Sequence, residues 1–131
     1  MQQNAVVILA GRILLAAVFL VSGYGKLVAF GATSAYFAKL GFPAADVMTV
    51  LAIAVELGGA ILLIAGWRAR WAALALIVFV VVATLAAHRF WEVDAAQVRN
   101  QTNHFLKNLA LIGGLLYVAA FGPGRISVNQ K

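Results

Sequence analysis

The feature that most constrains this chain is a series of four apolar runs, each about as long as a membrane-spanning helix. Crossing the hydrocarbon core takes roughly 20 mainly apolar residues in helical form, and the runs cover residues 5–30, 47–66, 69–88 and 105–122. With 64% hydrophobic and only 11% charged residues, a soluble domain of this size could not cover its surface with polar side chains. We therefore predict an all-α integral membrane protein, a four-transmembrane-helix antiparallel bundle forming a single domain over residues 1–131.

The connections between the runs carry their own signals. The apolar spacing from Ser34 to Leu40 predicts a short interfacial helix in the first loop, which Gly41-Phe42-Pro43 should end. The second and third runs are separated by little more than the segment from Gly66 to Trp71, so they should form a tight helical hairpin. Gly122-Pro123-Gly124 should end the fourth run, because proline cannot continue a helix.

The charge pattern predicts an orientation. The net charge is +6, but the basic residues are scattered singly among apolar runs instead of forming a stripe, so no nucleic-acid partner is expected. The hairpin turn and the two ends of the chain should share one face, where Arg68, Arg70, Arg125 and Lys131 have no acid beside them. The positive-inside rule then favours a multi-pass protein with both termini in the cytoplasm.

Two ionisable residues lie inside the apolar runs, where each costs about 2.5 to 3.5 kcal/mol at a helix centre. Glu56 is near the middle of the second run. It is either a structural group, neutral or paired so as to fix helix register, or a functional one that handles protons or binds a ligand. Arg12 lies at a depth that suits a pair with Glu56, unless the first span begins only there and Arg12 reaches the interface.

A second polar group is predicted near one mouth of the bundle. In an antiparallel bundle, the ends of the first and third spans and the start of the fourth lie on the same side. The polar side chains at these positions are Ser22, Lys26, His88, His104, Lys107 and Asn108. They are either surface anchors or, as the candidate ligand-binding set Lys26, Ser22, His88, Lys107 and Asn108, donors for a polar head on an apolar tail.

The composition excludes several kinds of chemistry. The chain has no cysteine, which removes thiolate metal sites, iron–sulfur clusters and dithiol redox chemistry. His88 and His104 lack carboxylates at metal-ligand spacing, so no metal is predicted. No motif for hydrolysis or phosphoryl transfer is present, so catalytic residues are unknown and no intrinsic cofactor is expected.

A resemblance covers roughly residues 8–128. The segment GRILLAAVFLVSGYGKL, residues 11–27, is similar to the first-span signature of the DoxX family of small bacterial inner-membrane proteins, particularly its YqjF-type members. Further landmarks follow in the family's order: Leu40–Pro43, Glu56–Gly59, His88–Trp91, Phe105–Leu109 and Gly122–Ser127. The polar positions that match are Arg12, Lys26, Glu56, His88, Lys107 and Asn108.

The resemblance implies a location and a working hypothesis. It places the chain in the bacterial cytoplasmic membrane, surrounded by membrane lipids. The family takes its name from a subunit of an archaeal quinol oxidase or thiosulfate:quinone oxidoreductase, so the resemblance implies a quinone- or lipid-binding accessory subunit of a membrane oxidoreductase complex. Without haem ligands of good geometry or cysteine, such a subunit would carry no electrons itself and would need a redox-enzyme partner.

Two alternatives remain open from the sequence. The chain is an enzyme at most in the sense of such a non-electron-carrying subunit. A non-enzymatic scaffold or assembly factor would use the same polar residues to set helix register. A small proton-coupled transporter would use Glu56 and Arg12 along its path, although four unbroken spans without a repeat suit a homo-oligomer better than a monomer.

Overall fold

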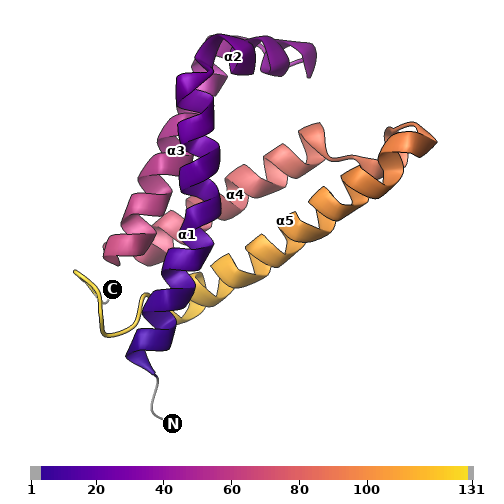
Figure 1. The fold of residues 1–131 in the computed structure, drawn as a ribbon. Coiled ribbons are helices and arrows are strands. Elements are labelled where there is room, and N and C mark those ends of the chain that lie inside the picture. Colours follow the sequence, from indigo (N-terminus) through magenta and orange to yellow (C-terminus); the bar gives the residue numbers. More distant parts are fainter. Residues whose placement is uncertain (1–3, 130–131) are drawn as a thin grey trace.

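The computed structural model describes residues 4–129 and contains long helices joined by short connections (Figure 1). No strand occurs in the described part of the chain. The elements are α1 (Ala5–Val28), α2 (Phe30–Lys39), α3 (Ala45–Ala65), α4 (Ala69–Ala87), the short 3₁₀ helix η1 (Phe90–Glu92) and α5 (Ala95–Phe121). The helices α1, α3, α4 and α5 are each long and apolar enough to cross a membrane, which confirms the predicted all-α, four-span architecture.

The helix boundaries differ from the apolar runs in two places. α1 ends at Val28 and α2 begins at Phe30, because the backbone at Ala29 leaves the helical region with φ −114° and ψ 43°. α5 begins at Ala95, ten residues before the predicted fourth span. Hydropathy detects where a helix enters lipid, whereas the polar first turns of α5 remain helical outside that run.

The four long helices are arranged as two pairs. α1 packs along α3, α4 packs along α5, and the pairs are joined where α3 packs on α4, whereas α1 and α5 have few contacts. Figure 1 shows the consequence: the pairs meet near the α3–α4 turn and diverge toward the opposite end, where α2 crosses the end of the α1–α3 pair. We call these the closed end and the open end.

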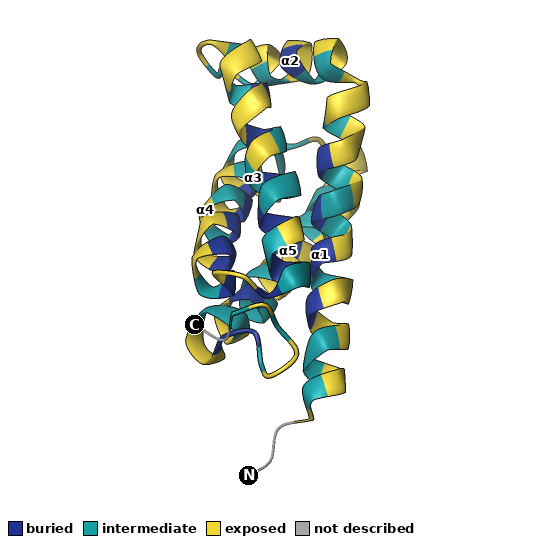
Figure 2. Ribbon diagram, turned by 90° about the vertical axis from the view of Figure 1, so that its left-hand side faces the viewer, coloured by how far each residue is buried: buried dark blue, intermediate teal, exposed yellow. Residues whose placement is uncertain are grey.

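Buried residues follow one narrow stripe along each helix, and most of the remaining surface is exposed (Figure 2). On α1 the buried positions are Arg12, Ala16, Phe19 and Gly23, a spacing of three to four residues that matches one helical face. An exposed apolar surface of this extent suits lipid as the surrounding solvent.

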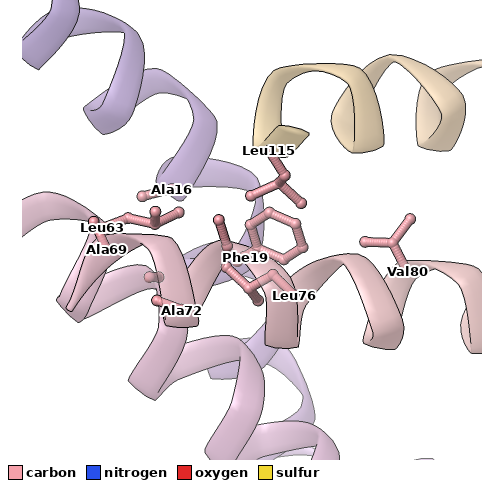
Figure 3. Packing of buried hydrophobic residues seen from close by; sticks show 10 residues of the cluster. Ala16, Phe19, Leu63, Ala69, Ala72, Leu76, Val80 and Leu115 are labelled. Atoms are coloured by element: carbon pink, nitrogen blue, oxygen red, sulfur yellow. The ribbon is translucent and has the colours of Figure 1, made fainter. Parts of the chain in front are cut away.

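The apolar core lies toward the closed end, where the helices approach most closely. Phe19 of α1, Leu63 of α3, Leu76 of α4 and Leu115 of α5 lie together there (Figure 3). Gly59 makes the approach of α3 to α4 feasible, since a Cβ at this position would lie 2.8 Å from Cγ of Leu76. Small residues at helix crossings are how membrane helices gain packing contacts.

The segment after α5, residues 122–129, folds back over the end of α3, and we call it the strap. The backbone N–H of Val128 donates to the Ala65 carbonyl at 2.9 Å, and that of Asn129 donates to the Gly66 carbonyl at 3.1 Å. These bonds satisfy carbonyls that the end of a helix leaves open. Only glycine fits at Gly66, because its φ is 73° and a Cβ there would collide with Ser127.

The start of α1, the strap and the α3–α4 turn all lie at the closed end, so both described ends of the chain are on this side (Figure 1). Arg68 and Arg70 therefore lie on the same side as the strap, as the charge pattern requires. Lys131, which contributed to the orientation argument, lies outside the described residues. The cytoplasmic placement of this end remains a prediction.

Candidate functional site

The buried acid in the second span forms an ion pair with a lysine of the first. Oε1 of Glu56 lies 2.6 Å from Nζ of Lys26, and Glu56 is only 2% exposed. Glu56 is eleven residues into α3, about 16 Å along the helix, which places it near the middle of a core about 30 Å thick. The prediction that Glu56 pairs with Arg12 was wrong. The long side chain of Lys26 extends inward from the end of α1 and reaches the carboxylate.

The local sequence explains why this pair forms. Ser22 lies one helical turn before Lys26, and its hydroxyl accepts a hydrogen bond from the lysine ammonium at 2.7 Å. Gly23 lies between them on the face toward α3, where a Cβ would come within 2.8 Å of Leu57 and 3.1 Å of the Glu56 side chain. The missing side chain therefore lets α1 approach α3 at the level of Glu56.

Arg12 has a different set of partners at the closed end. Its guanidinium donates to the Pro123 carbonyl of the strap and, at 3.0 Å, to the Ile64 carbonyl at the end of α3. Arg12 is 2% exposed, so its side chain is enclosed by protein, and its Nε atom has no hydrogen-bond partner in the described residues. A buried cation beside two helix C-termini is stabilised by the negative ends of their dipoles.

The Lys26–Glu56 pair lies in the wall of a cavity of about 580 Å³ between the two helix pairs. This volume is in the usual range for a small-molecule site. The surface of the cavity is mostly apolar. Apart from the hydroxyl of Tyr36 on α2, its polar groups come from α1, α3, α5 and the end of α4, and they belong to Ser22, Lys26, Glu56, His88, Lys107 and Asn108.

The structure thus brings together every residue of the predicted ligand-binding set. Glu56 lines the same cavity, whereas Arg12 does not. The roles of these residues in binding remain a prediction, because what the structure establishes is their common location.

The wall opposite Lys26 carries a second buried polar pair. Asn108 of α5 is buried and donates from Nδ2 to Oγ1 of Thr84 on α4 at 2.9 Å, and Thr84 donates to the Val80 carbonyl at 2.6 Å. Thr84 was not among the predicted residues. Its hydroxyl lies inside an otherwise apolar run, but threonine hydroxyls commonly bond the backbone of their own helix, so the residue type alone does not indicate a contact with another helix.

The two histidines lie at the open end but do not form a metal site. Their rings stack with centroids 4.7 Å apart and an interplanar angle of 16°, so their lone pairs lie in nearly parallel planes and do not converge on one point. Nδ1 of His88 is 2.8 Å from Oε1 of Gln101. His88 lines the cavity, whereas His104 does not and contacts the ring of His88.

A second hollow lies at the closed end between α1 and α5, with a volume of about 720 Å³. Its lining is apolar except for Asn4, Arg12 and the hydroxyl of Tyr117. Both terminal nitrogens of Arg12 are already bonded to carbonyls, and the Asn4 side chain caps the start of α1 by accepting from the Val7 N–H. This hollow therefore offers a ligand few free polar groups.

Comparison with known proteins gives the family. The DoxX family model matches residues 7–89. The chain is 32% identical to inner membrane protein YqjF of Escherichia coli over 94% of this chain and 89% of the relative. It is 29% identical to inner membrane protein YphA of the same organism, over 96% and 90%.

A eukaryotic protein is also similar. The chain is 30% identical to a Surfeit locus protein 4 homolog of Schizosaccharomyces pombe, covering 94% of this chain but only 36% of that protein. No solved structure matches the chain significantly. The family match and the near full-length likeness to the bacterial relatives confirm the resemblance in the sequence: the chain belongs to the DoxX family.

Proposed function

We propose that this protein binds an amphipathic membrane ligand, a quinone or a lipid with a hydrogen-bonding head, in the cavity between its two helix pairs. It does so in the bacterial inner membrane, where its E. coli relatives are named as residing, as an accessory subunit of an oxidoreductase complex. The observation that carries the proposal is an ion pair between the partly buried Lys26 and the buried Glu56, in the wall of a mostly apolar cavity.

The hydrogen-bonding capacity of the wall supports this class of ligand. The Lys26 ammonium has three N–H donors, of which Ser22 and Glu56 accept two. The Lys26 ammonium also lies 5.8 Å from the ring centroid of Phe79 on α4. One donor therefore remains for a carbonyl, hydroxyl or phosphate oxygen, and the apolar remainder of the cavity suits a hydrocarbon tail.

The charges favour an electron-rich head. The cavity is lined by two lysines, Lys26 and Lys107, and by one carboxylate, Glu56, so positive charge is in excess. Among the described residues, Lys107 has no ion-pair partner, and Glu56 accepts from Lys26 through Oε1 alone. The free Oε2 can accept a hydrogen bond from a hydroxyl of the ligand head.

The test is the lipid content of protein purified gently from its own membrane. Mass spectrometry of an organic extract should show quinone, or one phospholipid class, enriched over an unrelated four-helix membrane protein. The variant Lys107→Ala should lose the enrichment. The matched control is Lys39→Ala, which removes the same charge from the exposed end of α2 without touching the cavity.

The opposite result has a clear meaning. Quinone and phospholipid at control level in the unaltered protein would overturn the proposal and favour a scaffold. Equal loss in both lysine variants would show that surface charge, and not the cavity, retains the ligand.

A further inference from the structure

The ligand must reach the Lys26–Glu56 pair either from water at the open end or from the surrounding lipid. We infer that it enters sideways from the lipid between α3 and α4, and that α2 closes the cavity against the aqueous phase. This inference rests on the proposed function and adds the phase in which the ligand is dissolved.

The first observation is the exposure of the cavity's rim. Leu51 of α3 and Val78 and Val82 of α4 line the cavity, yet they are 51%, 63% and 48% exposed. A side chain that both lines a cavity and faces outward marks its opening. These three residues therefore place an opening between α3 and α4, on the side where these helices have diverged.

The second observation is the depth of this rim. Leu51 lies six residues beyond the start of α3 at Ala45, and Val82 five residues before the end of α4 at Ala87. At 1.5 Å per residue these positions are about 9 Å and 8 Å inside the helix ends. The rim is thus set within the hydrocarbon layer, where its neighbours are acyl chains.

The third observation is the cover at the open end. Tyr36 and Phe37 of α2, with Leu40 and Phe42 after it, line the cavity from above. The rings of Phe37 and Phe42 pack edge to face at 5.8 Å. An aromatic layer at the membrane surface excludes water from the space below while remaining stable at the interface.

α2 is also held in place over α3. The buried hydroxyls of Ser34 on α2 and Thr49 on α3 share a hydrogen bond of 2.9 Å, and Thr49 donates to the Ala45 carbonyl at 2.8 Å. Figures 1 and 2 both show α2 lying across the ends of α1 and α3 rather than extending them. The roof is therefore a bonded part of the fold.

Together these features define the class of ligand more narrowly. A membrane-dissolved molecule can place its head at Lys26 while a long tail extends through the opening into the bilayer, so the tail need not fit in the cavity. A water-soluble anion has no such route. The site is built for ligands longer than the cavity that never leave the lipid phase.

Cysteine accessibility tests the route directly, because the chain has no native cysteine. Single cysteines are placed at Val82 on the rim and at Val55 inside the cavity. The lipid-facing control is Val81→Cys, whose site is exposed but does not line the cavity, and the water-facing control is Asp94→Cys at the start of α5. Each cysteine is labelled with a nitroxide in detergent. After reconstitution in permeabilised vesicles, the collisions of the nitroxide with lipid-soluble oxygen and with a water-soluble nickel chelate are measured.

The expected pattern is specific. Nitroxides at Val82→Cys and Val55→Cys should collide with oxygen and not with the nickel chelate, as the nitroxide at Val81→Cys does. Adding Phe37→Ala should open the roof and make the nitroxide at Val55→Cys accessible to the chelate. If the nitroxide at Val55→Cys in the otherwise unaltered protein collides with the chelate as often as the one at Asp94→Cys, the cavity is open to water and the inference is overturned.

A ligand arm separates this inference from the proposed function. Quinone or phospholipid added to the vesicles should lower the oxygen collision rate of the nitroxide at Val82→Cys and leave that at Val81→Cys unchanged, which supports both the proposed ligand and the lateral opening. The expected collision pattern without protection by either addition would overturn the proposed ligand while supporting the lateral opening.

Discussion

The closed and open ends of the molecule each bond one cation of α1 in a different way: Arg12 is buried, and Lys26 is partly buried. Arg12 is about four helical turns from Lys26 and donates to the carbonyls of Ile64 and Pro123. Lys26 is paired with a carboxylate, Glu56, in a cavity wall. Backbone carbonyls are held in place by the chain, whereas an ammonium and a carboxylate on side chains can exchange hydrogen-bond partners. We therefore expect the closed end to contribute stability and the open end to bind the proposed ligand.

The largest effect is expected from breaking the closed end. Arg12→Met removes both donors to the carbonyls and should lower the free energy of unfolding by about 3 kcal/mol, since hydrogen bonds to charged groups contribute about 1.5 to 3 kcal/mol each. Thermal unfolding in detergent measures it, with Arg99→Met on the exposed surface of α5 as control. Ligand retained per folded molecule should not change. Equal stability of the two variants would refute the structural role of Arg12.

A smaller loss should follow from crowding the helix contact below the cavity. Gly59→Ala places a methyl group 2.8 Å from Leu76 and should cost about 1 to 3 kcal/mol by overpacking. Gly58→Ala is the matched control, because nothing lies within 4 Å of its added Cβ, and alanine favours a helix. Unfolding curves in which both variants behave alike would mean that α3 and α4 are not in close contact here.

At the open end the ion pair should couple its two members by about 1 to 2 kcal/mol, as contacting residues do. Lys26→Met leaves a buried carboxyl without its partner and should destabilise more than Glu56→Gln, which keeps an acceptor for the ammonium. The double variant should lose less unfolding free energy than the sum of the two single variants. Ligand retention should be abolished in the double variant and in both single variants. Additive losses in the unfolding free energies would show that the pair is not coupled.

The smallest stability effect is expected from filling the cavity itself. Ala83→Leu adds apolar volume to the lining and should change the unfolding free energy by no more than about 0.5 kcal/mol, while the ligand found in the extract decreases. Ala110→Leu, on the exposed face of α5 outside the cavity, should alter neither. A ligand content that survives Ala83→Leu would place the ligand elsewhere.

The sequence predicted the spans well because apolar length is a direct physical requirement of the bilayer. It predicted the members of the cavity from burial cost and shared topology, which brought Ser22, Lys26 and Asn108 to one side. It did not predict which cation meets Glu56. Pairing depends on how far a flexible side chain extends and on where a glycine such as Gly23 lets two helices approach.

The divergence of the two helix pairs could not be predicted either. Hydropathy assigns a residue to the membrane but not to a neighbour, so Val78 and Val82 look like any other lipid-facing valines in the sequence. Arg12 was singled out correctly as buried, but its acceptors are carbonyls. Every residue has one, so no residue type signals which of them will be used.

The separation of partners along the chain gives the two ends different folding histories. Lys26 and Glu56 are 30 residues apart, whereas Arg12 and the Pro123 carbonyl are 111 residues apart. The ion pair can form once α1 and α3 have been synthesised, but Arg12 must wait in the membrane until the strap emerges, and long-range contacts close slowly. The ion pair can therefore form first, on an intermediate that still lacks the α4 and α5 parts of the cavity wall and the strap.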